Sequence, residues 1–129
     1  MSTEKKSQTA KRILVVDDEP SLTTVFSAKL KRVGFITDVA HDGNEALKKI
    51  ADDRFDLIIL DLMMPKKDGF ETLQDLRSKG NNVPVIVASN LSQDEDIKKA
   101  KSLGANDYFV KVNTSLEDLV KKVSQQFNK

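Results

Sequence analysis

The sequence predicts an α/β protein in which five helices cover both faces of a five-stranded parallel sheet. Short apolar runs alternate along the chain with segments whose apolar residues recur every three or four positions, which is the order of strands and helices in such a sheet. The runs contain little polar alternation, as expected of strands that are buried on both faces. The length of 129 residues is typical of one domain.

The first strand is predicted at residues 13–16, where Ile-Leu-Val-Val forms a continuous apolar run. The first helix begins near Pro20, because proline is tolerated in a first helical turn. The predicted inner face of this helix, which ends at Gly34, consists of Leu22, Val25, Phe26, Leu30 and Val33.

The rest of the chain repeats the same alternation. The second strand, residues 35–40, is placed toward an edge of the sheet because Thr37 and Asp38 interrupt its apolar run. Pro84 falls at the start of the fourth strand, where a missing N–H group is tolerated. The remaining strands are predicted at residues 57–60, 83–88 and 107–110, and the remaining helical faces at residues 46–51, 70–76, 97–103 and 116–127.

Composition excludes several kinds of site. The chain contains no cysteine, which excludes disulfides, cysteine-bound zinc and thiol catalysis. Its single histidine, His41, excludes a histidine-rich metal site, and we interpret it as an exposed loop residue. The net charge of +1 argues against non-specific binding to nucleic acids or to acidic membranes.

No sequence feature predicts membrane insertion or secretion. No apolar run approaches the roughly 18 residues of a membrane span, and the N-terminus lacks the apolar core of a secretory signal. We therefore expect a flexible N-terminal segment at residues 1–11, a folded domain at residues 12–128, and a cytoplasmic location.

Polar side chains follow four of the five predicted strands. Asp17 and Asp18 follow the first strand, Asp61 the third, Ser89 the fourth and Lys111 the fifth. Because parallel strands end at the same edge of a sheet, we expect these side chains to lie together. Carboxylates without cysteine ligands suit Mg²⁺, or Mn²⁺, better than zinc. The lysine and the hydroxyl suit the oxygens of a phosphoryl group, which an aspartate can accept.

These residues stand in stretches that resemble the receiver domain of response regulators, including the stand-alone chemotaxis-type regulators. The matching stretches are residues 13–20 (ILVVDDEP), 56–69 (DLIILDLMMPKKDG), 84–89 (PVIVAS) and 104–111 (GANDYFVK), within a likeness that spans residues 12–127. The resemblance implies a flavodoxin-like fold with the strand order 2-1-3-4-5. It also implies a phosphorylation-controlled switch of a two-component or phosphorelay pathway, not an enzyme that turns over an external substrate.

The resemblance assigns roles to the acidic residues. Asp61 matches the phosphoacceptor, which receives a phosphoryl group from a histidine kinase or a histidine phosphotransfer protein with the help of Mg²⁺. Asp18 matches the direct metal ligand, and Asp17 matches the acidic residue that acts through water. The third protein ligand would be the backbone carbonyl of Met63.

Three further residues match the switching and contact positions of the family. Lys111 matches the lysine that contacts the phosphoryl group, and Ser89 matches the hydroxyl that moves toward it. Tyr108 matches the aromatic residue that changes rotamer, although a half-buried core aromatic is an equal interpretation. The expected output surface, for an unidentified protein partner, consists of the fourth helix, the fifth strand and the fifth helix. No direct contact with nucleic acid is expected.

The sequence departs from the family pattern at two positions. Val112 follows Lys111, where the family usually has a proline in a cis peptide. A cis non-proline bond costs roughly 3 kcal/mol, so we expect a trans bond and a shifted loop. Asn90 follows Ser89, where a small residue is usual; its side chain could crowd the phosphoryl site or contact it.

The resemblance also bears on the lifetime of the phosphorylated state. The positions two after the phosphoacceptor and two after the switch hydroxyl flank the approach of a hydrolytic water. These positions are the apolar Met63 and Leu91, so we expect slow self-dephosphorylation.

Three alternatives stay open at this point. An aspartyl-phosphate phosphatase shares the nucleophilic aspartate and Mg²⁺, but it usually needs an acid–base aspartate at the position of Met63. A binding module that works without phosphate would show the same partner affinity in both states. The chain could also be a receiver taken from a longer regulator with a DNA-binding domain.

Overall fold

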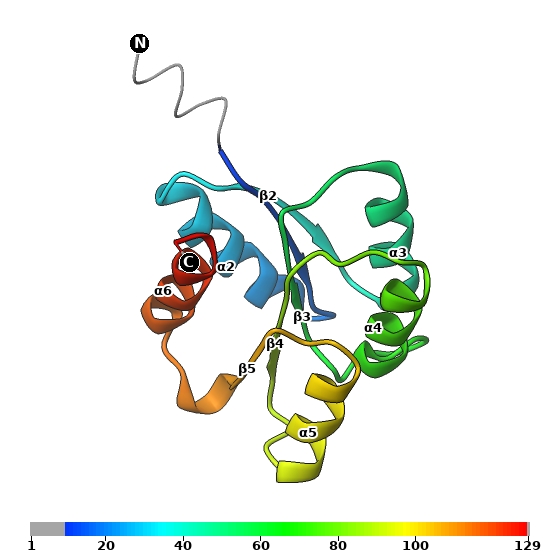
Figure 1. Cartoon of the computed structure of the whole chain (residues 1–129). Helices are drawn as coiled ribbons and strands as arrows, with labels where there is room; N and C mark the ends of the chain where they lie inside the picture. The colour runs from blue at the N-terminus through cyan, green and yellow to red at the C-terminus, as the bar shows by residue number, and fades with distance from the viewer. Residues whose placement is uncertain (1–9, 129) are drawn as a thin grey trace.

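The computed structural model describes residues 10–128, and within this range strands and helices alternate (Figure 1). The predicted flexible segment, residues 1–11, lies outside the described residues except for Ala10 and Lys11. The longest described helix has 13 residues, and none in this range is long and apolar enough to span a bilayer. The elements are β1 (Arg12–Val16), α2 (Pro20–Arg32), β2 (Ile36–Ala40), α3 (Gly43–Asp52), β3 (Leu57–Leu60), α4 (Gly69–Ser78), β4 (Val85–Ser89), α5 (Asp94–Ser102), β5 (Asp107–Val110), the 3₁₀ helix η1 (Lys111–Asn113) and α6 (Leu116–Phe127).

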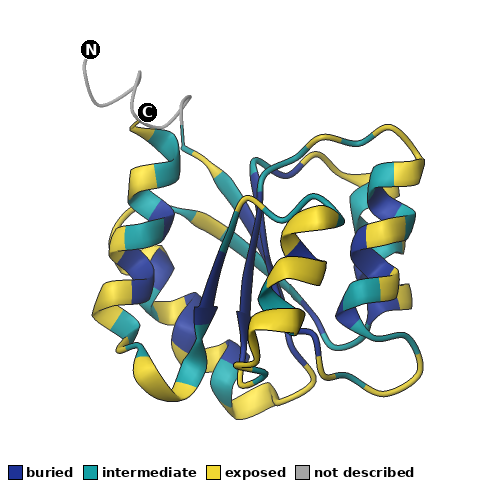
Figure 2. Cartoon of the chain, turned by 60° about the horizontal axis from the view of Figure 1, so that its bottom comes forward, coloured by how far each residue is buried: buried dark blue, intermediate teal, exposed yellow. Residues whose placement is uncertain are grey.

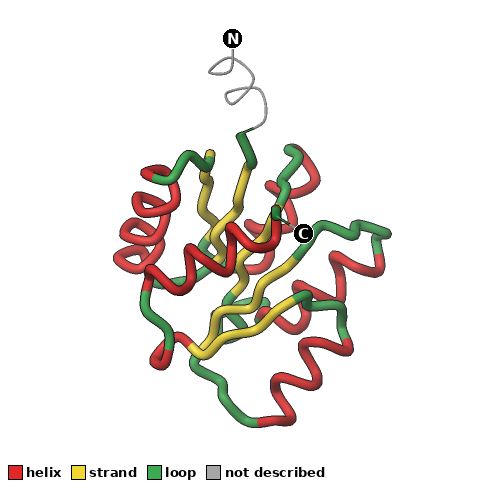
Figure 3. The backbone as a smooth tube through the Cα atoms, turned by 60° about the vertical axis from the view of Figure 1, so that its left-hand side comes forward, coloured by secondary structure: helices red, strands yellow, loops and turns green. Residues whose placement is uncertain are grey.

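All strand pairs of the sheet are parallel, in the order β2-β1-β3-β4-β5. Figure 3 shows the strands gathered in the middle of the molecule, with helices around them. The order implied by the resemblance is thus confirmed, as is the edge position of β2. The chain leaves β1 for the edge and then returns across it to β3. Such a reversal in strand order opens a crevice at the carboxyl ends of β1 and β3, where ligands bind in open parallel sheets.

Helices cover both faces of the sheet, with α2 and α6 on one face and α3, α4 and α5 on the other (Figure 1). Successive side chains of a strand point to opposite faces. In β1, Leu14 and Val16 pack toward α3, α4 and α5, whereas Ile13 and Val15 pack toward α2 and α6. This double burial explains the continuous apolar runs, and Figure 2 shows the central strands buried throughout.

The first helix buries a different stripe from the one that the sequence predicted. Phe26 and Leu30 are buried as expected, but Val25 is 52% exposed and Val33 is 55% exposed. Val25 is one residue, or about 100° of helical rotation, away from Phe26. Val33 lies just beyond the end of α2. The polar Thr23 is buried instead, because its hydroxyl donates to the carbonyl of Pro20 at 2.9 Å.

Candidate functional site

Three carboxylates meet at the carboxyl edge of the sheet. Asp17 and Asp18 follow β1 and Asp61 follows β3; these neighbouring strands pair Val16 with Leu60. One oxygen from each of the three carboxylates lies within 4.8 Å of the others. Asp17 and Asp61 are only 5% exposed, whereas Asp18 is exposed.

Backbone hydrogen bonds fix the direction of the two buried carboxylates. The Asp61 amide donates to the carbonyl of Val16 at 2.9 Å, which extends the strand pairing by one residue. The amide of Met63 donates to Asp61 Oδ1 at 3.3 Å, and the amide of Glu19 donates to Asp17 Oδ1 at 3.1 Å. The second oxygen of each carboxylate is therefore directed toward the crevice.

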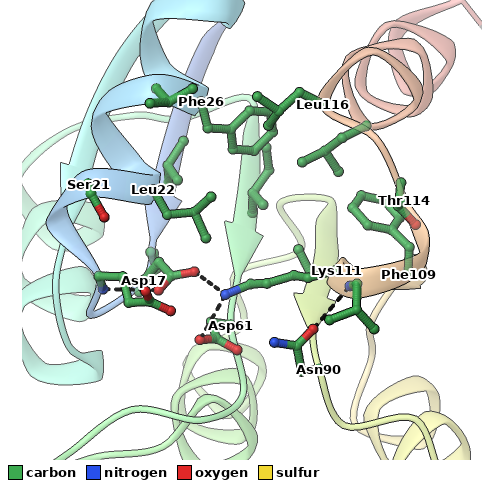
Figure 4. Close-up of a pocket in the computed structure, with 18 residues that line it drawn as sticks. Asp17, Ser21, Leu22, Phe26, Asp61, Asn90, Phe109, Lys111, Thr114 and Leu116 are labelled. Atoms are coloured by element: carbon green, nitrogen blue, oxygen red, sulfur yellow. Dashed lines mark hydrogen bonds and ion pairs between the residues drawn. The ribbon is translucent and has the colours of Figure 1, made fainter.

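Lys111 reaches these carboxylates from the end of β5 (Figure 4). Its Nζ lies 3.2 Å from Asp61 Oδ2 and also forms an ion pair with Asp17 Oδ2. Buried carboxylates are costly unless they are paired, so the lysine offsets part of their repulsion. The structure thus brings together Asp17, Asp18, Asp61 and Lys111, as the sequence predicted.

The site holds more negative than positive charge, because three carboxylates face one lysine. Burial raises the pKa of Asp61; the cation of Lys111 opposes this effect, and the charge of Asp17 adds to it. Burial acts to lower the pKa of Lys111, but the hydrogen bond to Asp17 and the nearby carboxylates raise it overall. One lysine faces three carboxylates, and all the ligand atoms are hard oxygens. This donor set fits a divalent cation such as Mg²⁺.

Ser89, the last residue of β4, is fully buried and lies apart from this network. Its Oγ accepts a hydrogen bond from the amide of Leu91 at 3.3 Å. Within residues 10–128 it makes no hydrogen bond to the carboxylates or to Lys111. The structure therefore places Ser89 at the predicted edge, with its hydroxyl bonded to its own loop.

Tyr108, in β5, belongs to the core and to the same loop. Its ring packs with the buried cluster on the α3–α4–α5 face. Its hydroxyl donates to the carbonyl of Leu91 at 2.6 Å. Burial raises the pKa of Tyr108, and the charges of Asp96 and Asp61 add to this effect. Ser89 and Tyr108 thus share Leu91 as a partner without a hydrogen bond between them.

Met63 and His41, which the sequence analysis also singled out, both lie at least partly at the surface. Met63 is 55% exposed beside Asp61. His41 is half-exposed in the loop before α3, where its amide donates to Glu45 Oε1 at 2.7 Å.

The Lys111–Val112 peptide is trans, as expected, and residues Lys111–Asn113 form a 3₁₀ turn. Sequence reasoning left the direction of Asn90 open. Its Oδ1 accepts a hydrogen bond from the amide of Val112 at 3.1 Å (Figure 4). Asn90 therefore bridges the loops that follow β4 and β5.

A cavity of about 490 Å³, which the sequence did not predict, opens beside Asp17 and Asp61. It lies between α2 and the segment from η1 to α6, and its walls are mainly apolar (Figure 4). The one feature of the sequence that hints at this cavity is Val112, an apolar residue in a loop. In the structure, Val112 lies in the cavity wall and is 75% exposed. Asp17 and Asp61 belong to the polar part of a largely apolar cavity wall.

Comparison with known proteins adds the observation that decides the family. The family model described as the response regulator receiver domain matches residues 13–124. This chain belongs to that family. Receiver domains are phosphorylation-controlled switches of two-component systems, and this one has the acidic cluster and the lysine at the expected edge of the sheet.

Solved structures and curated relatives agree with this assignment. The receiver domain of the Francisella response regulator 1452 has a TM-score of 0.86 at 34% identity, and the match covers 92% of this chain and 97% of that one. The chemotaxis response regulator CheY4 of Vibrio cholerae has a TM-score of 0.84 at 32% identity, covering 91% and 98%.

The curated relatives are longer than this chain. The alkaline phosphatase synthesis transcriptional regulatory protein PhoP of Bacillus subtilis (strain 168) is 42% identical over 101 residues, which cover 78% of this chain and 42% of PhoP. The receiver domain spans less than half the length of the curated relatives that it matches. Because several of them are named as transcriptional regulators, the expected lack of direct nucleic-acid contact stays a prediction.

Proposed function

We propose that this receiver domain accepts a phosphoryl group on Asp61 from the phosphohistidine of a kinase or a phosphotransfer protein, with Mg²⁺ assisting. The supporting observation is the contact of Asp61 Oδ2 with Lys111 Nζ at 3.2 Å, next to Asp17 and Asp18. This arrangement combines a nucleophilic carboxylate with a cation that faces the same space. Phosphoryl transfer depends mainly on positioning and charge neutralisation, which these groups supply.

Asp18, Asp61 and the backbone carbonyl of Met63 would hold Mg²⁺ directly, and Asp17 would act through water. When bound, the ion offsets the negative charge of the phosphoryl oxygens. The partners of Asp17 support its indirect role, because its two oxygens already accept from the Glu19 amide and from Lys111. Asp18 is exposed and accepts no hydrogen bond within the described residues, so its oxygens are available.

In the transfer step, a carboxylate oxygen of Asp61 forms the new O–P bond as the P–N bond to the donor histidine breaks. The bonding electron pair leaves with the imidazole. The Nζ of Lys111 then exchanges its contact with the Asp61 carboxylate for a contact with a phosphoryl oxygen. This exchange keeps the lysine paired throughout, so no buried charge is left uncompensated.

The switch would begin at the loop after β4. A movement of Ser89 toward the phosphoryl group breaks the hydrogen bond between its Oγ and the Leu91 amide. The Leu91 carbonyl accepts a hydrogen bond from the Tyr108 hydroxyl, so the same movement of the loop disturbs this bond and frees the Tyr108 side chain to change its rotamer. Tyr108 lies in β5, between α5 and α6, which form the surface expected to bind the output partner. One local charge event would thus bias a two-state surface.

Mass spectrometry after incubation with acetyl phosphate and Mg²⁺ tests this function. The wild type and Asp52→Ala, a control at an exposed carboxylate near the end of α3, are expected to gain one phosphoryl group. Asp61→Ala is expected to gain none. An unchanged yield in Asp61→Ala would reject Asp61 as the acceptor.

A second experiment addresses a binding module that works without phosphate. Partner proteins are captured with the beryllofluoride-treated domain and with the untreated domain, and the bound fractions are compared. We expect the treated form to retain a different set of partners. Identical capture by both forms would favour binding that does not depend on phosphorylation.

A further inference from the structure

One side-chain hydrogen bond joins the two loops that follow β4 and β5. Asn90 comes directly after Ser89, and Val112 comes directly after Lys111. The Oδ1 of Asn90 accepts from the Val112 amide at 3.1 Å (Figure 4). The strands beneath are neighbours, with Ser89 paired to Val110. The bond therefore lies just beyond this strand pair, where β4 ends at Ser89 and Lys111 follows β5.

This hydrogen bond needs a backbone N–H group at position 112 and a side-chain acceptor at position 90. A proline at position 112 has no N–H group and could not donate. A glycine or alanine at position 90 has no side-chain acceptor. The two departures from the family pattern thus provide the donor and the acceptor of a single hydrogen bond.

The bond acts on the turn that contains Lys111. Apart from the contacts of the Lys111 side chain with Asp17 and Asp61, two hydrogen bonds at this turn are local. The Thr114 amide donates to the carbonyl of Lys111 at 3.2 Å, and the Thr114 hydroxyl donates to that of Val110 at 3.0 Å.

Such local bonds shape the turn, and the pairing of Ser89 with Val110 holds its first end to β4, but neither holds the residues that follow Lys111. The contact between Asn90 and Val112 extends the link with the β4 side of the sheet to the residue after Lys111.

We propose that Asn90 is a positioning residue, whose amide oxygen fixes the turn that presents Lys111 to Asp61 and ties it to the loop of Ser89. The inference rests on the proposed phosphorylation of Asp61. With the bond in place, Lys111 waits in a defined position beside the carboxylate. Without it, the turn samples other positions, and the lysine meets the incoming phosphoryl group less often.

Hydrogen exchange of the Val112 amide tests the contact without any phosphorylation. We expect this amide to exchange about three- to tenfold faster in Asn90→Ala than in the wild type, a change that matches the loss of one hydrogen bond. Asn90→Asp keeps an acceptor oxygen and should restore the slow exchange. Equal exchange in the wild type and Asn90→Ala would overturn the proposal.

A double-mutant cycle tests the effect on reactivity. The rate of phosphorylation by acetyl phosphate is measured for the wild type, Asn90→Ala, Val112→Pro and the double variant, after thermal unfolding has shown that each is folded. We expect Asn90→Ala to react about three- to tenfold more slowly than the wild type, a loss of the size that one hydrogen bond supplies. It should add nothing in the Val112→Pro background, where the donor is already absent.

The outcomes separate this proposal from the proposed function. Asn82→Ala, an exposed asparagine elsewhere on the surface, should react like the wild type. If the wild type itself gains no phosphoryl group, the proposed function has failed, while the exchange result still stands. If the wild type reacts and Asn90→Ala reacts equally fast, the positioning role is wrong. The role is also wrong if Asn90→Ala lowers the rate by the same factor in the Val112→Pro background as in the wild-type background.

Discussion

Gly69, the first residue of α4, packs directly against the backbone of Asp61. A Cβ atom at position 69 would lie 2.3 Å from the carbonyl oxygen of Asp61 and 2.6 Å from the Cα of Leu62. The Gly69 amide also donates to the Leu62 carbonyl at 3.0 Å. The glycine is therefore required by space, and the start of α4 fixes the place of Asp61.

Gly69→Ala is predicted to destabilise the fold and to slow phosphorylation, because the backbone of Asp61 must move away from the added methyl group. Overpacking of this kind typically costs about 1–3 kcal/mol. Chemical denaturation gives the stability, and the acetyl phosphate reaction gives the rate. Gly34→Ala is the control: Gly34 has a φ of 104° with nothing within 4 Å of its added Cβ. That variant should lose stability through strain alone and keep its rate.

Asp18→Asn is predicted to weaken Mg²⁺ binding more than Asp17→Asn. The oxygens of Asp17 already accept from the Glu19 amide and Lys111, whereas Asp18 is exposed and lacks such partners in the described part of the chain. We expect Asp18→Asn to bind at least about tenfold more weakly than Asp17→Asn, equivalent to about 1.4 kcal/mol. Calorimetric titration measures both affinities. Equal or tighter binding by Asp18→Asn would reverse the ranking.

Arg77, in α4, connects the α4–β4 loop with the α5–β5 loop at the other end of the sheet. Its guanidinium donates to the carbonyls of Asn81 at 2.9 Å, Val83 at 2.7 Å and Gly104 at 2.8 Å. Burial lowers the pKa of Arg77, although a guanidinium stays protonated in proteins.

Arg77→Ala is predicted to lower the free energy of unfolding by about 2–3 kcal/mol, because it leaves several carbonyls without a donor. Arg77→Lys should recover less than half of this loss, since an ammonium lacks the planar fork of donors. Urea denaturation measures both. Arg54→Ala, at an exposed arginine, is the control and should change stability by less than about 0.5 kcal/mol. A similar loss in that control would show that charge, not the hydrogen bonds, is responsible.

The sheet and the acidic edge could be predicted because they depend on short-range patterns. Continuous apolar runs mark strands buried on both faces, and parallel strands must end at one edge. The positions of Asp17, Asp61 and Lys111 follow from these two rules. The strand order itself came from the resemblance, since five parallel strands allow several orders.

Details that depend on rotamers and close contacts could not be predicted. Ser89 stands at the expected strand end, yet its hydroxyl is bonded to the Leu91 amide. The contact between Asn90 and Val112 joins residues 22 positions apart and depends on the side-chain rotamer of Asn90. The crowding at Gly69 arises only when the start of α4 packs against the backbone of Asp61 and Leu62.

Met63 and Leu91 line one cavity together with Asp18, and the volume of this cavity is about 490 Å³. The Leu91 side chain cannot hydrogen-bond a water molecule, and the Met63 sulfur is only a weak acceptor. Asn90 has the nearest amide in sequence, and its Oδ1 is already engaged by the Val112 amide. The structure therefore brings the two apolar residues to the same side of the site.

Hydrolysis of an aspartyl phosphate needs a water held in line behind the phosphorus, so the wild type is predicted to lose its phosphoryl group slowly. The double variant Met63→Asn, Leu91→Glu offers two polar groups to that water and should hydrolyse about tenfold faster, equivalent to roughly 1.4 kcal/mol of barrier. Decay of the phosphorylated protein is followed in Mg²⁺ after the donor is removed. Val33→Asn, which makes an equally exposed apolar residue polar at the end of α2, should decay like the wild type. A wild-type half-life of seconds would mean that another group, with the free amide nitrogen of Asn90 as the first candidate, already positions the water.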